Sequence, residues 1–461
     1  MKWWGGGYGS GTGYNCPSGT PSAPIVFTYY GDPNDDLPNL LFPFPATTAS
    51  KFRHVLCFAN VKNIVVDGLQ FYDTRFSVND KRTSAYCAQG IQAGQFGFDA
   101  EGVPGEVDSI TIKNCIFSNI GYGIFSVGSN IKILNNHFSN FKANGDTIGI
   151  NDIGADALLP TGKKYLIQGN YISGSWAYAN PNSSSGGLLG GGLESINDFD
   201  SSLIIQNIFI DNSGGMEFGQ NEGTQYGPND DTFAYNLFIN NGKVIYVNTV
   251  GSVFSCSAAR IRFWNNAIID NNKCRFTGPG FGGDAMNDGQ TFASTGFIFW
   301  PTYPVNPSID NYTGYRTFQY GGDNIVGNPD TLLDIRNNII WITTGTQAKY
   351  SSRTKIFYRN NLYHTVGGYL FPSAVGAALG VGELIDTTTQ FLTDTSSIYP
   401  QNWNYYPSSN SVLIDAGQFI KTFFDYVGNP VGNPPDIGAY EFIPPAVPTG
   451  TLRVRKRFQS L

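Results

Sequence analysis

Two glutamates that occupy the same place in a short repeated run are the clearest candidates for chemistry in this sequence. Glu194 ends a Gly-Leu-Glu run and Glu217 ends a Gly-Met-Glu run. If both runs are strands on neighbouring turns of a repeat, the carboxylates lie about 5 Å apart and repel by roughly 3 kcal/mol at an effective dielectric constant of about 20. Such a pair requires a shared proton, a cation or a positively charged substrate group. Asn151 follows the strand expected at 148–150, one turn earlier, and an Asn–Glu–Glu set offers the hard oxygen ligands that Ca²⁺ prefers.

Paired acids also suit a hydrolase, which needs one protonated carboxyl group and one ionised partner. The acids available for these two roles are Asp152, Asp156, Glu194, Asp198, Asp200, Glu217, Glu222, Asp230 and Asp231. The alternative is that Glu194 and Glu217 are two solvated side chains on a wet surface, without a chemical role.

An eight-residue pattern that recurs nine times predicts the elements that position these residues. The pattern reads apolar, any, apolar, any, Asn or Gly, variable, any, apolar. Its copies begin at Ile64, Ile110, Ile131, Tyr165, Leu203, Thr232, Ile261, Leu333 and Ile356. The first, third and eighth positions are expected to face a core. The third position predicts an aliphatic stack of Ile112, Ile133, Ile167, Ile205 and Ile335.

The fifth and sixth positions of the pattern predict a sharp corner and a ladder. The fifth position holds Gly68, Asn114, Asn135, Gly169, Asn207, Asn236, Asn265, Asn337 and Asn360. Asn and Gly adopt a left-handed backbone at little cost, so each copy is predicted to be a strand, a corner residue with positive φ and a second strand. The sixth position predicts a hydrogen-bonded ladder of Asn136, Asn170, Asn266, Asn338 and Asn361.

The spacing of the copies predicts an all-β fold, a right-handed single-stranded parallel β-helix. Asn114 and Asn135 are 21 residues apart, and Asn337 and Asn360 are 23 apart. With a third strand between copies, three strands in about 22 residues make one rung of a solenoid. A propeller would keep a constant period. The larger insertions are expected on one side, where they would wall a groove; they are 72–89, 142–147, 175–190 and 273–332.

Composition and charge exclude several classes of function. Gly supplies 56 of 461 residues and charged residues only 14%, which favours many short strands and tight turns over helices. The net charge of −7 provides no basic field for nucleic acid. No run of about 18 apolar residues could span a membrane, and no secretory signal is visible at the N-terminus. The six Cys form no metal-ligand motif.

Both ends of the predicted solenoid resemble secreted right-handed parallel β-helix proteins of the pectate-lyase-like superfamily, many of them from Bacteroidota. Residues 407–441 contain Asp415, Gly417 and Asp425 and finish with a D-x-G-A-x-E run that starts at Asp436 and ends at Glu441. Residues 18–31 resemble the first rung of the same proteins. The resemblance covers most of 15–441 and implies the fold, but the superfamily includes lyases, hydrolases and phage tailspikes.

The Asn–Glu–Glu set resembles the calcium site of the alginate-lyase and chondroitinase B family. In that family Ca²⁺ neutralises the uronate and a Lys acts as base beside an Arg. The family places a Lys closely after its two Glu, whereas Ser195 follows Glu194 here. The resemblance therefore implies that Lys243, with Arg260 or Arg262, would take those roles.

These observations predict one β-helix domain over 1–441, with an insertion at 273–332 and a closing segment at 365–441, followed by a Pro-rich linker and basic tail at 442–461. The expected function is binding, and cleavage by a lyase or hydrolase mechanism, of an extracellular polysaccharide. The alternative is a non-enzymatic structural or adhesive protein, such as a tailspike or a surface fibre subunit. The location is then extracellular, at a cell surface or in a virion. The tail at 451–461 would serve self-association or an assembly partner, and the alternative is a disordered tail.

Overall fold

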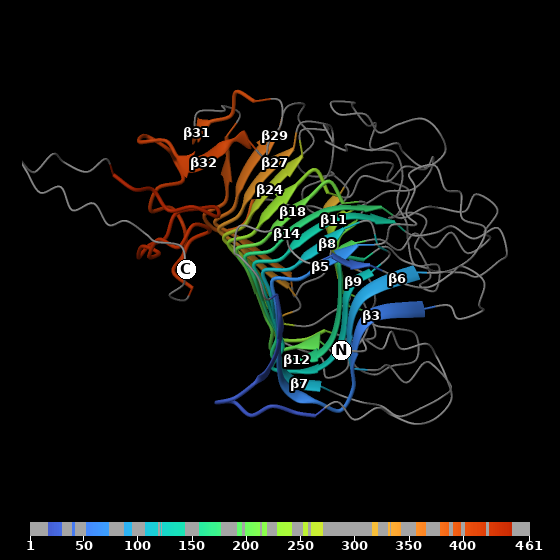
Figure 1. Ribbon diagram of the computed structural model, residues 1–461. Helices are drawn as coiled ribbons and strands as arrows, with labels where there is room; N and C mark the ends of the chain where they lie inside the picture. The colour runs from blue at the N-terminus through green and yellow to red at the C-terminus, as the bar shows by residue number, and fades with distance from the viewer. Residues whose placement is uncertain are drawn as a thin grey trace, which may run out of the picture.

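Strands from distant parts of the chain lie side by side in parallel and wind into a solenoid (Figure 1). The structure is a computed structural model that describes residues 17–29, 39–41, 52–72, 87–94, 107–118, 120, 122–142, 156–176, 191–195, 199–212, 214–218, 228–241, 252–256, 260–270, 316–320, 331, 333–342, 356–365, 379–386, 391–397, 402–420 and 424–444. None of these residues forms an α-helix, and so none of them belongs to a helix that could cross a membrane. The strands of successive rungs stack into three files, which we call A, B and C.

File A contains the strands that carry the two candidate glutamates. Its members pair in parallel in the order given. They are β3 (Phe52–Phe58), β6 (Cys87–Ala93), β9 (Tyr122–Ser129), β12 (Leu158–Lys163), β15 (Gly191–Ser195), β19 (Gly214–Phe218), β22 (Ser252–Cys256) and β25 (Arg316–Tyr320).

File B holds the first strand of each sequence repeat, and file A joins it around a corner in one sheet of 19 strands. The members of file B are β1 (Ile25–Thr28), β4 (Lys62–Asp67), β7 (Val107–Lys113), β10 (Lys132–Leu134), β13 (Leu166–Gln168), β17 (Leu203–Ile205), β20 (Thr232–Ala234), β23 (Ile261–Trp264), β26 (Leu333–Arg336) and β28 (Ile356–Arg359). The short strand β16 (Phe199–Asp200) pairs with β12 at the corner between the files.

File C holds the second strand of each repeat and forms a separate sheet of 11 strands. Its members are β2 (Asn39–Leu41), β5 (Gln70–Tyr72), β8 (Ile116–Ser118), β11 (His137–Lys142), β14 (Tyr171–Trp176), β18 (Ile208–Ile210), β21 (Leu237–Ile239), β24 (Ala267–Asp270), β27 (Ile339–Ile342), β29 (Leu362–Thr365) and β30 (Leu384–Ile385). An antiparallel hairpin of β31 (Leu392–Asp394) and β32 (Asn404–Pro407) lies near the C-terminal rungs of this file (Figure 1).

The order A, B, C, repeated from β3 to β27, makes the right-handed parallel β-helix that the repeat spacing predicted. The long segments 73–86, 143–157, 177–190 and 271–315 all run from a strand of file C to a strand of file A, as expected. The predicted insertion at 273–332 is too long, because residues 316–320 within it form β25 of file A. Shorter segments at 94–106, 219–231 and 321–332 run from file A to file B.

The corner between files B and C requires a left-handed residue in each rung, but two of the predicted corner residues are wrong. Leu203 pairs with Leu166 and Thr232 pairs with Leu203, so these two copies begin one residue earlier than the apolar pattern indicated. Gln206 and Tyr235 therefore occupy the corner, with φ of 58° and 56°. The predicted core residue Ile205 faces outward for the same reason, and Ile204 takes its place in the core.

The asparagine ladder is longer than predicted, because Asn207 and Asn236 belong to it rather than to the corner. Each amide Nδ2 donates to the Oδ1 of the next rung at 2.9–3.1 Å, without a break. The members are Asn136, Asn170, Asn207, Asn236, Asn266, Asn338 and Asn361. From Asn170 to Asn361, each Oδ1 also accepts the backbone N–H of the ladder residue on the preceding rung. The ladder satisfies buried backbone groups that the corner would otherwise leave unpaired.

The core inside the three files is a stack of like side chains. Phe71, Phe117 and Phe138 stack on one another at the eighth position of the repeat, with ring centroids 4.7 and 4.8 Å apart. Phe209 and Phe238 repeat the arrangement further along, at 5.0 Å. Stacking every rung on an equivalent residue keeps the cross-section constant, and so fixes the direction in which outward side chains point.

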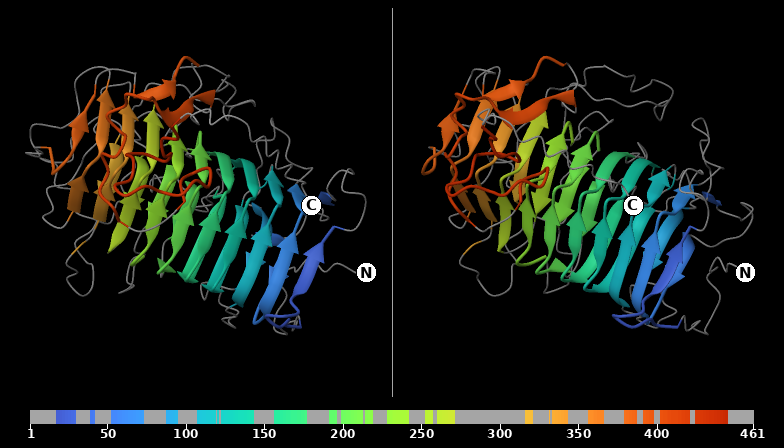
Figure 2. Two further views of the ribbon diagram at one scale, coloured as in Figure 1. Left: turned by 90° about the vertical axis from the view of Figure 1, so that its left-hand side faces the viewer. Right: turned by 60° about the vertical axis from the view of Figure 1, so that its left-hand side comes forward.

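The closing segment lies back over the corner between files B and C (Figure 2, left). The part of this segment that lies on the corner consists of the described residues 413–420 and 424–441. The corner side chains of Gln206, Asn265, Asn337 and Asn360 donate to its carbonyl oxygens. Tyr235 is only 2% exposed, beside Asp425, Asp436 and Glu441. The corner accepts Gln and Tyr there because the closing segment provides them with contacts.

The D-x-G-A-x-E motif is part of this closure. Asp436 accepts the backbone N–H groups of Asp415 and Phe442, and Asp425 accepts those of Val427, Asn429 and Glu441. These carboxylates replace the backbone partners that an irregular segment lacks, so Asp425 and Asp436 have a structural role.

Candidate acid site on file A

Glu194 and Glu217 are neighbours on adjacent rungs of file A, as the sequence predicted. The parallel register pairs Glu194 of β15 directly with Glu217 of β19. Leu193 points into the core, so Glu194, the next residue along the strand, points to the outer side of file A. Glu194 is nevertheless 4% exposed, and a buried carboxylate needs a partner.

Asp156 provides that partner. It lies two residues before β12, is 1% exposed, and its side chain hydrogen-bonds to Glu194. Its Oδ1 also accepts the backbone N–H of Gly191 at 2.7 Å. Burial raises the pKa of Asp156 from 3.8 to about 6, against the opposing effect of these two hydrogen bonds. Two carboxyl groups can hydrogen-bond to each other only when one of them carries a proton.

The outward side chains of file A form a row that changes from apolar to polar at Glu194. On one side of Glu194 the register brings Leu159 and then Phe125 into line, and on the other side it brings Glu217 and then Ser255. The acids therefore stand between an apolar stretch and a polar stretch of the same row.

The structure brings together only part of the predicted site. The strand next to β15 is β12, at 158–163, rather than the strand expected at 148–150, so Leu159 has the register position that was predicted for Asn151. Asn151 itself and Lys243 lie outside the described residues. Arg262 is on β23 of file B, where its Nη2 lies 2.5 Å from Asp230 Oδ1. File B is a different face of the solenoid, so the structure does not place Arg262 with Glu194.

The other acids of the hydrolase set have different surroundings. Asp230 pairs with Arg262, and Asp200 is half-buried at the corner between files A and B. Asp231 occupies the first, core-facing position of its repeat and is fully buried, with its Oδ1 accepting the backbone N–H of Ser202 at 2.8 Å. Burial raises the pKa of Asp231 well above its usual value. Asp152, Asp198 and Glu222 lie outside the described residues.

Cys115 is the only cysteine among the described residues whose thiol is assigned as free, and it packs in the core. The Cys115 thiol is free and buried, donates to Lys113 O at 3.1 Å, and has its pKa raised to about 11 by burial. His364 also packs: it is 1% exposed and lies against Trp341 with ring centroids 4.0 Å apart. Among the residues that the structure describes, no cluster of three His, Cys, Asp or Glu side chains could hold a metal ion.

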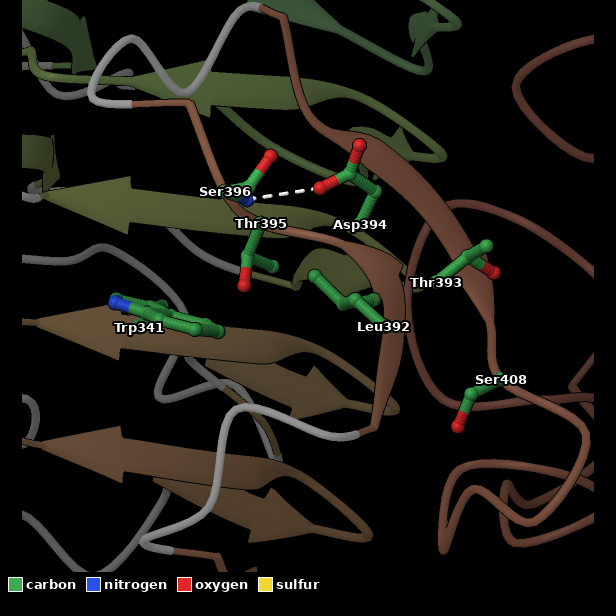
Figure 3. A pocket seen from close by; sticks show the side chains of 7 residues that line it. All are labelled: Trp341, Leu392, Thr393, Asp394, Thr395, Ser396 and Ser408. Carbon is green, nitrogen blue, oxygen red and sulfur yellow. Dashed lines mark hydrogen bonds between the residues drawn. The ribbon is translucent and has the colours of Figure 1, made fainter.

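An open pocket of about 620 Å³ lies between file C and the β31–β32 hairpin (Figure 3). Its lining is Trp341, Leu392, Thr393, Asp394, Thr395, Ser396 and Ser408. The backbone N–H of Ser396 donates to Asp394 at 2.9 Å and lowers the pKa of that carboxyl group. Trp341 is 4% exposed and packed against His364 and Trp403, so its ring is not free to stack on a ligand.

Sequence reasoning included Asp156 among nine candidate acids but had no means of selecting it. Its partner Glu194 is 38 residues away across a long segment, and neither residue lies in a repeat copy. The only available signal was that Asp156 stands directly before a strand of the same file as Glu194.

Comparisons with known proteins found likenesses among solved structures. No protein-family model matches the sequence, and the curated proteins include no significant match. Among solved structures, pectate lyase Pel9A matches with a TM-score of 0.36 and 13% identity, over 88% of this chain and 87% of that one. The surface adhesin PfbA of Streptococcus pneumoniae matches at 0.34 and 17%, over 47% and 52%, and alginate lyase AlyGC at 0.33 and 12%, over 94% and 57%.

These likenesses say nothing of activity at such scores, and the alignment spans about half of the adhesin and of AlyGC. The class of the protein rests on its own strand register: it is a right-handed parallel β-helix, as the resemblance implied.

Proposed function

We propose that this protein binds an extracellular polysaccharide along the outer side of file A and cleaves it by acid–base catalysis at the Asp156–Glu194 pair. The observation that supports this proposal is the hydrogen bond between two buried carboxyl groups, next to a third acid in register. A pair that holds one proton below about pH 6 can donate it to a glycosidic oxygen, which is the first requirement of glycoside hydrolysis.

Glu217 is the partner carboxylate in this proposal. Neighbouring strands lie about 4.8 Å apart, close to the separation of about 5–5.5 Å between the two carboxyl groups of retaining glycosidases. Glu217 would therefore attack or stabilise the anomeric carbon from the rung next to the donor. The apolar residues Leu159 and Phe125 in the same row would contact the faces of the bound sugars.

A calcium-dependent lyase uses the same two glutamates differently. The carboxylate oxygens of Glu194 and Glu217 suit Ca²⁺, and the repeat spacing offered Asn151 as a third ligand. A bound Ca²⁺ would neutralise the carboxylate of a uronate. This arrangement needs an ionised Glu194, so it competes with the proton that Glu194 shares with Asp156.

The test is an incubation with a panel of acidic and neutral polysaccharides, in Ca²⁺ or in a chelator, with detection of new reducing ends and of unsaturated uronate. Hydrolysis gives the first signal without the second, and does not need Ca²⁺. Glu194→Gln and Asp156→Asn should slow cleavage by about a hundredfold or more, whereas Asp67→Asn, an acid paired with Lys113 on file B, should not.

Two results would overturn the proposal. Full activity in Glu194→Gln would remove the acid pair from the mechanism. Tight binding of a polysaccharide by the unmodified protein, with no product under any condition, would favour the adhesive or tailspike alternative.

A further inference from the structure

A group of six outward side chains on the last three rungs of file B has the composition of an anion-binding surface. In one row Arg262 pairs with Asp334 and Asp334 with Phe357; two residues further along each strand, Trp264 pairs with Arg336 and Arg336 with Arg359. We call these six residues the file-B basic patch. They alternate with core residues along β23, β26 and β28, so all six face outward.

The centre of the patch is held in place by Asp334. This acid is 6% exposed and accepts hydrogen bonds from Arg336 Nε at 2.6 Å and from Trp264 Nε1 at 3.3 Å. Arg336 Nη1 reaches Gln418 Oε1 at 3.2 Å, in the closing segment. The ring of Trp264 and the guanidinium of Arg336 are therefore fixed before any ligand arrives, which reduces the entropy lost on binding.

The two outer arginines each lie over an aromatic ring on their own strand. The Arg262 guanidinium is 5.9 Å from the Trp264 ring and pairs with Asp230, and that of Arg359 is 5.1 Å from the Phe357 ring. Within the described part of the chain, no acid lies within ion-pair distance of Arg359. Arg359 is half-buried, and among the described residues its charge meets the Phe357 ring but no acid.

The charge of the patch differs from that of the whole chain. Three arginines outweigh Asp334 and Asp230, which leaves +1 (3 − 2) on a protein of net charge −7. On the two preceding rungs the equivalent outward positions are neutral: Leu203, Ile205, Thr232 and Ala234. The positive charge is therefore local.

We propose that the file-B basic patch is a second binding surface, which holds the carboxylate groups of an acidic polysaccharide chain lying along the solenoid axis. Guanidinium groups bind carboxylates in a bidentate manner, and the rings of Trp264 and Phe357 supply apolar contact to the sugars beside them. Successive rungs are about 4.8 Å apart, so the patch contacts a few consecutive sugars.

An acidic polysaccharide fits the charge of this protein better than a nucleic acid does. DNA carries one negative charge per about 1.7 Å of duplex and would be repelled by a chain of net charge −7. The choice of a polysaccharide rests on the proposed function, whereas the surface itself does not depend on Glu194.

The experiment is native gel electrophoresis through gels that contain polygalacturonate, neutral dextran or no polymer, with the full chain and with its Glu194→Gln variant. The double variant Arg262→Gln/Arg359→Gln should bind polygalacturonate about tenfold more weakly or worse, because two charge-assisted contacts are lost. The matched control is Lys113→Gln/Lys132→Gln, which removes the same charge from outward positions on earlier rungs of file B. The control should retain the affinity of the unmodified chain.

Equal weakening by both double variants, or by neither, would overturn the proposal. So would tighter binding of a single-stranded oligonucleotide than of polygalacturonate. Arg359→Gln alone leaves the Arg262–Asp230 pair intact and should also weaken binding, so a folding defect in the double variant does not decide the result. The proposed function fails in a different measurement, the cleavage assay, if the Glu194→Gln variant still cleaves the polysaccharide.

Discussion

Glu383 accepts the last hydrogen bond of the asparagine ladder, from Asn361 Nδ2 at 3.1 Å. The same carboxylate also accepts the Tyr363 hydroxyl and the backbone N–H of Gly380. A ladder of amides always ends with an unpaired donor, because each member gives its N–H to the next rung. A carboxylate, which only accepts, is the side chain that terminates such a ladder without leaving a buried donor unpaired.

The middle of the ladder should be the most sensitive position. In Asn207→Ala the N–H and Nδ2 groups of Asn170 lose their acceptor, both at 2.9 Å, inside the core. With about 1–3 kcal/mol for each buried unpaired donor, we expect the free energy of unfolding to fall by about 3 kcal/mol or more. Chemical denaturation measures it. The outward Thr111→Ala on file B should change it by less than about 0.5 kcal/mol, and a similar loss in both variants would contradict the ladder's role.

Asp231 should make the protein less stable as the pH rises. Its pKa in the folded state is raised by burial, so above the unfolded value of about 3.9 the unfolded chain releases a proton that the folded chain retains. The free energy of unfolding then falls with increasing pH until the folded pKa is passed.

The test is Asp231→Asn, which keeps an acceptor for Ser202 N–H and cannot ionise. It should gain on the order of 1 kcal/mol at pH 8 and nothing near pH 4, in thermal unfolding followed at several pH values. Asp230→Asn, next to it and paired with Arg262 at the surface, should show no such gain. A pH-independent difference between Asp231→Asn and the unmodified chain would contradict the assignment.

Lys164 has a left-handed backbone without a compensating side-chain contact among the described residues. Its φ is 59°, and its exposed side chain follows β12 at the corner between files A and B. Asn tolerates this conformation better than Lys, so Lys164→Asn should stabilise the fold by about 0.5–1 kcal/mol. The neighbouring Lys163→Asn, within the strand, should bring no gain, and thermal unfolding compares the two. A greater gain at Lys163 would show that charge rather than backbone conformation is responsible.

The proposed acid pair predicts how cleavage depends on pH. Since burial raises the pKa of Asp156 to about 6, the pair loses its proton above that pH and kcat should decline there. Asp156→Asn should lower kcat by about a hundredfold or more and remove this alkaline limb from the residual activity. An unchanged pH profile in the variant would exclude Asp156 from proton transfer.

Much of the fold could be predicted from the sequence because the corner between files B and C limits the residue type. The prediction failed at Ser202 and Asp231, where polar residues occupy core positions and accept backbone N–H groups of the preceding rung. A pattern that requires an apolar residue at the first position starts these two copies one residue too late. It therefore assigns Asn207 and Asn236 to the corner instead of the ladder. The Glu194–Glu217 pair was predictable from two matching strands. The role of Asp156 and the file-B basic patch were not, because both depend on which distant segments become neighbours.

The contact of Gln206 with Asp425 joins residues 219 positions apart in a molecule whose other contacts mostly connect adjacent rungs. A solenoid held only by its neighbours can fray from either end, one turn at a time. Here the closing segment contacts rungs from Gln206 to Asn360 at once, so opening any one of those turns exposes part of a shared interface. Denaturation of this half of the molecule should therefore be concerted, with amide hydrogens from β17 to β28 exchanging at one common rate.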